Sequence, residues 1–431
     1  MKPTEIVSVT AMQTSTDERN PAVKVTVTTR NGAKGSGSAF ESFSVSDYRP
    51  KYLYDNGEKY FGNGVTAAVS IIENIIAPAI IGMDAFSQGE VDCAIKGALD
   101  QAGLERAVNL TNPVSVAVLK AAAASLKLPL YRYIGGRSAF TLPFAGYRVA
   151  SGGKRYCADS KAQGKPIYNL VSHGFSTFAE ATYALWETAN VYEKMLAKNY
   201  GILVHRGFSL DIPAGRVEND KQLLTMMTES INQAGYTGKI GIHIDVGASL
   251  YYDPESGLYK GLFDTADKTT DKLFAYYEQM VKEYPIVILQ DPFDQHDMEH
   301  HAKLLATTGI EIAGQDLCGS SPEHIMECIS IGCINALVIS VCCFETFSDV
   351  INIVRFAKNH DVDIIPLDCS GEGLSVAQYA VGFRSGAIYQ SGLHSACNPL
   401  LAIEDEIGPR ARYYGTDGLK GNAFRLQQNK M

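Results

Sequence analysis

Three closely spaced histidines are the side chains whose types and spacing most directly suggest chemistry. His296, His300 and His301 share one short segment, and if it is helical, His296 and His300 stand four residues apart on one face. Imidazoles at this spacing are compatible with zinc ligation. The same spacing is also typical of a solvated helix face, and we favour that interpretation over a metal site.

A carboxylate at the end of an apolar run, Asp245 in the segment 240–246, is a second candidate. A carboxylate at the end of a buried strand can bind a metal ion. It can also accept hydrogen bonds from neighbouring backbone amides, as short polar side chains often do. We favour amide capping for Asp245, and the metal site stays open as the alternative.

Length and charge limit the classes of protein to consider. The 431 residues suit a barrel of about 250 residues with a second domain attached. With 46% hydrophobic and 20% charged residues, the composition is that of a globular protein, which excludes a disordered chain. The net charge of −9 argues against nonspecific binding of nucleic acid.

No apolar stretch is long enough to span a membrane, and the first residues do not begin a signal-peptide pattern. We therefore expect a soluble, cytoplasmic protein with no membrane partner. The nine cysteines include no CxxC pair, and Cys342 and Cys343 are adjacent in an apolar run. They are interpreted mainly as reduced thiols in or near the core.

The first third of the chain predicts a sheet followed by helices. Residues 23–29 alternate with a period of two and end at Asn31-Gly32, which indicates a strand and a turn. Residues 64–128 show helical spacing of apolar residues and few helix breakers. Gly135, Gly136 and Pro143 then interrupt regular structure, which places a domain boundary at about residues 136–142, and residues 140–144 form a short strand-like run.

The remaining chain alternates short β-rich runs with helical segments. Candidate strands are residues 240–246, 286–289, 310–313, 336–341 and 363–367, and candidate helices are residues 271–284, 322–331 and 348–359. Such alternation predicts parallel strands with crossover helices, and a closed barrel is the common solution. An open doubly wound sheet is the alternative, but no GxGxxG follows a strand.

Several motifs together resemble the enolase family in sequence, order and spacing. They are Asn20–Val25, Lys59–Val65, Leu128–Ile134, Ile244–Ser249, Ile288–Gln295 and Ala402–Gly408, and they extend over nearly the whole chain. The resemblance implies an α/β protein with an N-terminal α+β domain, residues 1–138. It implies an enolase-type (β/α)8-like barrel over residues 139–431.

The resemblance also implies a metal site, which this chain has changed. Enolases use a lysine base, and magnesium stabilises the charged intermediate. Their three metal-binding carboxylates match Asp245, Gln290 and Gln315, so two have become amides, which are weaker ligands for a hard cation. Asp316 is no obvious substitute, because adjacent strand residues point to opposite sides. A family serine that completes the second metal site matches Ser36, which we expect in a flexible Gly/Ser surface loop.

The positions that match the family's base and substrate contacts are changed as well. Ser340 stands in place of the lysine base, and Gln390 in place of a lysine that holds the substrate carboxylate. In the loop that contains Ser370, Cys369 replaces an arginine that would grip the phosphate, and Asp368 replaces a histidine. These replacements remove the base and the cations, and Asp368 adds a charge that would repel a phosphate.

On the opposite wall, Asn169 and His205 match two catalytic glutamates of the family, and Arg155 matches a histidine. His205 and Arg155 could form a new anion site. Because nothing around them requires a ligand, we favour polar side chains that fill a vacated cleft.

Two functions from different classes follow from this pattern. We favour a non-catalytic enolase homologue, a structural or interaction protein with protein partners, no catalytic residue and no cofactor. Inactive relatives in cytoskeletal and flagellar structures make a microtubule, cilium or flagellum the partner class suggested by analogy. The alternative is a binder or enzyme that reuses the altered cleft, and residual phosphopyruvate hydratase activity is the weakest option. Family enolases are commonly homodimers, but Lys24 and Ala402 replace a glutamate and an arginine in the two segments that those dimers bring together, so a homodimer stays an open alternative for this chain.

Overall fold

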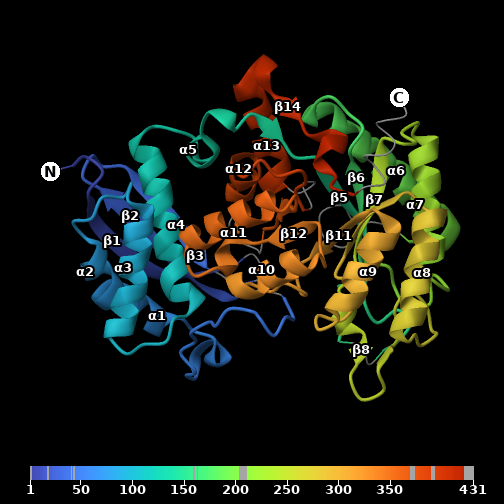
Figure 1. Cartoon of the computed structure of the whole chain (residues 1–431), viewed down its shortest axis with the longest axis horizontal. Helices are drawn as coiled ribbons and strands as arrows, with labels where there is room; N and C mark the ends of the chain where they lie inside the picture. The colour runs from blue at the N-terminus through green and yellow to red at the C-terminus, as the bar shows by residue number, and fades with distance from the viewer. Residues whose placement is uncertain are drawn as a thin grey trace.

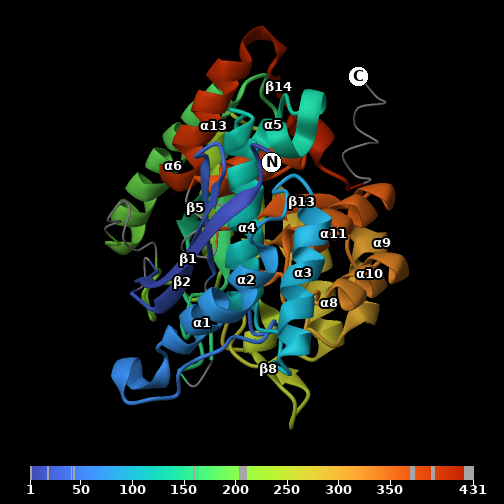
Figure 2. The same ribbon diagram turned by 90° about the vertical axis from the view of Figure 1, so that its left-hand side faces the viewer.

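The computed structural model describes residues 2–16, 19–39, 41, 44–158, 161–162, 164–202, 211–368, 374–389 and 394–421. The chain forms an N-terminal part, in which helices pack on a small sheet, and a larger part in which strands and helices alternate around a barrel. The N-terminal part lies at the left of Figure 1 and the barrel at the right. Figure 2 shows the molecule from the N-terminal side.

The N-terminal sheet is antiparallel, with the order β1–β2–β3. Its strands are β1 (Ile6–Ser15), β2 (Pro21–Thr29) and β3 (Lys34–Ala39). The alternation that predicted β2 is confirmed, because Val23, Val25 and Val27 are all buried on one face. The strands β1 and β3 were not predicted.

The helices of the N-terminal part confirm the helical interpretation of residues 64–128. They are α1 (Thr66–Ile71), a π-helical turn (Ile72–Ile76), α2 (Ala77–Ile80), α3 (Gln88–Gln101), α4 (Val108–Ser125) and α5 (Leu130–Gly135). α4 is buried along almost its whole length between the sheet and the barrel. In Figure 1 it lies between α3 on the left and the barrel helix α11.

The expected Gly/Ser loop around Ser36 is instead strand β3, so that prediction was wrong. Ser36 pairs with Thr26, and their hydroxyl oxygens lie 3.1 Å apart. The neighbouring glycines serve packing rather than flexibility. A Cβ on Gly35 or Gly37 would lie 2.2 Å from backbone atoms of α4, so only glycine lets β3 approach the helix this closely.

The barrel sheet has the order β13–β12–β11–β10–β7–β6–β5. Its strands are β5 (Ala145–Ala150), β6 (Ile167–Ser172), β7 (Ile240–Asp245), β10 (Ile286–Gln290), β11 (Glu311–Gly314), β12 (Ala336–Ile339) and β13 (Asp363–Pro366). In this sheet β7, β10, β11, β12 and β13 are parallel, whereas β6 is antiparallel to both neighbours. The segment 386–389 closes the barrel, since Phe144 donates to Gly386 and Tyr389 donates to Pro366.

Helices and short strand pairs connect and cover these strands. The helices are α6 (Phe178–Tyr200), α7 (Lys221–Gln233), α8 (Thr270–Glu283), α9 (Met298–Thr308), α10 (Pro322–Ile331), α11 (Phe347–Asn359), α12 (Ser375–Gly382) and α13 (His394–Ile407). The pairs are β4 (Thr141–Leu142) with β14 (Arg412–Tyr413), and β8 (Tyr252–Asp253) with β9 (Leu258–Tyr259). The strands and helices predicted after residue 240 are confirmed to within one or two residues.

Local sequence signals fix the ends of several barrel helices. Thr346 and Asp349 form a capping box at the start of α11, and Thr177 caps α6. Gly201 ends α6 in the left-handed conformation. Most described cysteines lie in the core, as predicted. The buried free thiols are Cys318, Cys328, Cys333, Cys342 and Cys343.

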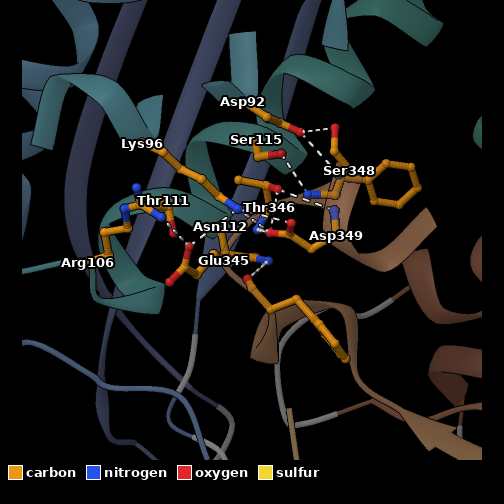
Figure 3. A network of polar contacts seen from close by, with 12 residues as sticks. Asp92, Lys96, Arg106, Thr111, Asn112, Ser115, Glu345, Thr346, Ser348 and Asp349 are labelled. Carbon is orange, nitrogen blue, oxygen red and sulfur yellow. Dashed lines mark hydrogen bonds and ion pairs between the residues drawn. The ribbon is translucent and has the colours of Figure 1, made fainter. Parts of the chain in front are cut away.

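The two parts of the molecule are joined by hydrogen bonds to the start of α11 (Figure 3). The Ser115 hydroxyl on α4 accepts from the Phe347 N–H at 2.9 Å, and the Asp92 carboxylate on α3 accepts from the Ser348 N–H at 3.1 Å. The Asn112 amide donates to the Phe344 carbonyl at 2.7 Å. The N-terminal part thus supplies caps that a barrel helix needs.

Charged side chains continue this interface toward the surface (Figure 3). Lys96 lies 2.8 Å from Asp349 and 3.4 Å from Glu345, and Arg106 lies 3.7 Å from Glu345. In each pair the cation comes from the N-terminal part and the carboxylate from the barrel. The pairs are partly exposed, so they contribute less to stability than the buried caps.

No single helix among the described residues is long and apolar enough to cross a membrane. By length and composition alone, α4 together with residues 130–138 passes that test. The two segments meet at 92°, and α4 is almost entirely buried in the protein.

Candidate functional site

The carboxyl ends of β7, β10 and β11 bring three buried carboxylates together. Asp245 ends β7, Asp291 directly follows β10, and Asp316 lies just beyond β11. Parallel strands place their carboxyl ends at one mouth of a barrel, where enzymes of this architecture carry their active sites. Buried carboxylates need hydrogen-bond donors or a cation nearby.

Lys165 supplies that cation. Its Nζ lies 2.8 Å from Oδ1 of Asp245 and 3.6 Å from Oδ2 of Asp316. Burial alone would lower the pKa of Lys165, but Asp245, Asp316 and Asp291 together raise it above its ordinary value. The side chain is therefore a charged ammonium at neutral pH.

Two predictions about these carboxylates are corrected. Asp245 does not cap backbone amides, because its partners are Lys165 and the Tyr389 hydroxyl, which donates to Oδ2 at 2.7 Å. Asp316 does not face away from the site, because β11 ends at Gly314 and strand alternation no longer applies. Its other carboxylate oxygen accepts from the Ser44 hydroxyl at 2.7 Å.

Asp291 has the role that was expected of Asp245. Its carboxylate accepts from the backbone N–H groups of Gln315, Asp316 and Leu317 at 3.0 to 3.1 Å. Burial and the neighbouring Asp316 raise the pKa of Asp291, whereas Lys165 and the amides oppose that shift. Asp291 thus fixes the turn that carries Gln315 and Asp316.

The two amides that replace carboxylates bind each other. The Gln290 Nε2 donates to Oε1 of Gln315 at 2.9 Å, and Oε1 of Gln290 lies 3.2 Å from Nε2 of His243. Burial lowers the pKa of His243 to about 4, so the imidazole is neutral near pH 7. Its Nε2 then carries the proton that it donates to Gln290.

Asn169 and Ser340 lie in the barrel wall. Asn169, on β6, is paired with His243 of β7 in the sheet register and is buried. Neither polar atom of its amide has a hydrogen-bond partner among the described residues. Ser340 follows β12, and its hydroxyl oxygen lies 3.3 Å from Sγ of Cys342. No described base orients that hydroxyl.

The remaining predicted positions are only partly covered by the structure. Asp368 lies two residues beyond β13 and is half-buried. The predicted positions His205, Cys369, Ser370 and Gln390 lie outside the described residues.

Arg155 is paired inside the protein and does not present a free guanidinium to an anion. Its Nη2 donates to Asp220 at 2.6 Å, and its Nη1 donates to the carbonyls of Ser151 and Gly152. The Asp220 carboxylate also accepts from the hydroxyls of Tyr156 and Tyr168. Both charges of the Arg155–Asp220 pair are buried.

The histidine group is also dispersed. α9 begins at Met298, so His296 precedes the helix and does not share a face with His300. His296 contacts Asp294 and Asp47, His300 contacts Asp297, and His301 is buried against Phe293. The condition for an i, i+4 pair, a helix that includes His296, is therefore not met, because Asp297 caps the helix and Met298 is its first residue.

The residues do not fit the magnesium ions that the family resemblance implies. Among the described residues, no group of three or more His, Cys, Asp or Glu side chains is arranged to hold a metal ion. Two ligand positions are amides that bind each other, and an ammonium already contacts Asp245. Sequence reasoning missed Lys165, His243 and Tyr389. A lysine in a Gly-Lys-Pro segment before a strand carries no signal that distinguishes it from a surface loop.

Two family models match adjacent parts of the chain. The model described as "Enolase, N-terminal domain" matches residues 6–134, and "Enolase, C-terminal TIM barrel domain" matches residues 139–422. A protein named enolase from Methanopyrus kandleri is 32% identical over 422 residues, covering 95% of this chain and 97% of its own. Proteins named enolase from Bifidobacterium longum and Bifidobacterium adolescentis are 31% and 30% identical over 433 residues, each covering 96% of this chain and 98% of its own.

Proposed function

Because this chain belongs to the enolase family, we propose that it is a non-catalytic member that acts as a structural or interaction protein. The proposal separates the scaffold, which the family models match over residues 6–134 and 139–422, from the chemistry at the barrel mouth. A barrel fold by itself does not fix a function, so the argument rests on particular side chains.

The observation that carries this proposal is the hydrogen-bonded pair of Gln290 and Gln315. Each has one amide oxygen that could bind a metal, and both oxygens are engaged. The oxygen of Gln315 accepts from Gln290, and the oxygen of Gln290 lies against His243. A neutral amide pair that is satisfied internally offers little to a hard divalent cation.

Proton abstraction also lacks a group to perform it at the position that the resemblance assigns. Ser340 stands there, and its hydroxyl contacts the Cys342 thiol rather than a base. Loss of one general acid or base typically slows an enzyme by about 10² to 10⁴. Replacement of both the base and the metal ligands supports an inactive protein.

The test is an assay of 2-phosphoglycerate dehydration with purified protein in magnesium. The enolase of Bifidobacterium longum, purified in the same way, is the positive control. We expect no turnover above a blank preparation. Turnover that requires magnesium, survives purification and disappears in Asp245→Ala would refute the proposal.

We further propose that the function lies on the surface, with protein partners in the cytoplasm and a cytoskeletal or flagellar structure as the suggested context. Exposed aromatic side chains support a surface role. Phe61 is fully exposed on a turn where Tyr60 and Phe61 both have positive φ, and Trp186 stacks on Tyr183 along α6. Bulky residues rarely adopt positive φ, and such strain is often retained for a function.

Complementation in the native cell tests this surface role. The surface variants Phe61→Ser and Trp186→Ser are compared with the cleft variant Asp368→Asn, after each is shown to melt like the parent. We expect at least one surface variant to lose function and the cleft variant to keep it. Loss of function confined to the cleft variant would contradict the proposal.

One observation favours the alternative, a small-molecule binder in the altered cleft. The buried amide of Asn169 has no partner among the described residues, and a ligand could satisfy it. Asn169→Leu distinguishes the two functions. If the cleft is vestigial, the variant should be at least as stable as the parent and functional, because an unpaired buried amide has been removed. A binder should instead lose function.

A further inference from the structure

The lysine at the barrel mouth comes from outside the strands that carry the carboxylates. Lys165 lies in the segment between β5 and β6, two residues before Ile167, which pairs with Asp245 in the sheet register. The Tyr251 hydroxyl donates to the Lys165 carbonyl at 2.5 Å and holds the backbone in place. The side chain can therefore reach across the end of β7 to Asp245 and Asp316.

A glycine makes room for the stem of this lysine. Gly247 has φ of +56°, and a Cβ at this position would lie 2.3 Å from Cδ and 3.3 Å from Nζ of Lys165. The enolase motif that this segment resembles has alanine here, so Gly247 departs from the family pattern. Side-chain atoms cannot approach to 2.3 Å, so the lysine in this position requires glycine at 247.

Lys165 offsets part of the negative charge at the mouth. Asp245 and Asp316 keep their carboxylates, whereas Gln290 and Gln315 are neutral. Lys165 places one ammonium where the remaining negative charge would otherwise face a low-dielectric interior without compensation. The two amides, Gly247 and the buried contacts of Lys165 thus occur together at one site.

We propose that Lys165, for which Gly247 leaves room, takes the place of the divalent cation of this fold. Its ammonium holds the ends of β7 and β11 together without a metal ion. The proposal goes beyond loss of catalysis, since an inactive protein could still depend on a bound ion. If Lys165 takes the place of the cation, the stability of the protein does not depend on magnesium, and the position of the Lys165 side chain depends on Gly247.

The first test removes the charge and keeps the length of the side chain. We expect Lys165→Met to lower the melting temperature by roughly 5 °C or more, because it leaves buried carboxylates without their cation. Lys161→Met, an exposed lysine in the same segment, is the matched control and should change nothing. Lys165→Met/Asp245→Asn should recover at least half of the loss. A melting temperature unchanged in Lys165→Met would overturn the proposal.

If Lys165→Met does not fold, the triple variant Lys165→Met/Asp245→Asn/Asp316→Asn carries the test. We expect it to fold, because Lys165 and both carboxylates that it contacts have lost their charge. Failure of this triple variant to fold would overturn the proposal too.

The second test is a double-mutant cycle between positions 165 and 247. Gly247→Ala should lower the melting temperature strongly in the parent, where the new Cβ meets the lysine stem. In Lys165→Ala the stem is absent, so the same change should cost only the strain of a positive φ. Equal effects of Gly247→Ala in both backgrounds would overturn the matched pair.

The third test adds magnesium to the unmodified protein. The melting temperature in 10 mM magnesium chloride, compared with the same buffer containing EDTA, should not change. Binding to the native state alone would stabilise it in proportion to ln(1 + [L]/Kd), so a working cation site would be visible as a rise. Such a rise would overturn the replacement. The activity assay is independent of all three tests.

Discussion

Replacing Asp220 with asparagine should destabilise the barrel strongly, because Asp220 is the buried partner of Arg155. Asp220 is fully buried, and its carboxylate neutralises Arg155 at 2.6 Å. It also accepts from the Tyr156 hydroxyl at 2.7 Å and from Tyr168. Asp220→Asn keeps the shape but leaves a buried guanidinium unpaired, which costs about 3 to 5 kcal/mol.

Urea denaturation followed by circular dichroism measures this loss. With a slope of about 3 kcal/mol per M, the transition midpoint should fall by roughly 1 to 1.7 M. Arg155→Met/Asp220→Asn removes both charges and should be more stable than Asp220→Asn alone. Lys154→Met, next to Arg155 but exposed, is the control. A midpoint for Asp220→Asn within 0.2 M of the parent would refute the buried pairing and reopen an anion site at Arg155.

Three further changes test other parts of the structure. Gly37→Ala places a Cβ 2.2 Å from the Pro113 carbonyl oxygen and should lower the free energy of unfolding by at least about 1 to 3 kcal/mol. Gly97→Ala, in open space on α3, is the control and should not destabilise the protein, and thermal melts compare the two variants. Burial lowers the pKa of His301 to about 4, so the folded state binds fewer protons than the unfolded state between pH 4 and 6.5, and stability falls as the pH falls. At pH 5 the loss of folding free energy is about 2 kcal/mol. His301→Gln should remove this loss from the pH dependence of the urea midpoint, and a pH dependence equal to that of the parent would contradict the prediction. Asn112→Asp places a carboxylate against two carbonyls before α11 and should cost roughly 3 kcal/mol in the same assay, and a neutral effect would contradict the interdomain contact.

The second half of the fold could be predicted because its strands and helices differ clearly in pattern. Residues 286–289 form a continuous apolar run, which is typical of a strand buried on both faces. Residues 347–359 carry apolar side chains at helical spacing after a capping box. Strand β3 was missed because its Lys-Gly-Ser-Gly-Ser-Ala sequence has the composition of a loop. Its extended conformation comes from packing against α4, and no signal in the local sequence of β3 indicates that packing.

The candidate site was predictable in position but not in its contacts. The resemblance identified Asp245, Gln290 and Gln315, and the structure brings all three to the barrel mouth. Lys165 could not be found in this way, because its role depends on a backbone path between β5 and β6 and on the absence of a side chain at Gly247. Such pairings link residues distant in sequence, and neither residue type alone signals the other.

The caps on α11 have a consequence for how the chain is made. Ser115 precedes Phe347 by 232 residues, and Asp92 precedes Ser348 by 256. At about 5 to 20 residues per second, translation delivers these acceptors roughly 12 to 50 s before the amides that they bind. An N-terminal part that folds during this interval presents a finished docking site to the emerging helix. The order of synthesis then matches the order of assembly, and a ribosome that began at residue 139 would produce a barrel whose α11 lacks two of its first hydrogen-bond acceptors.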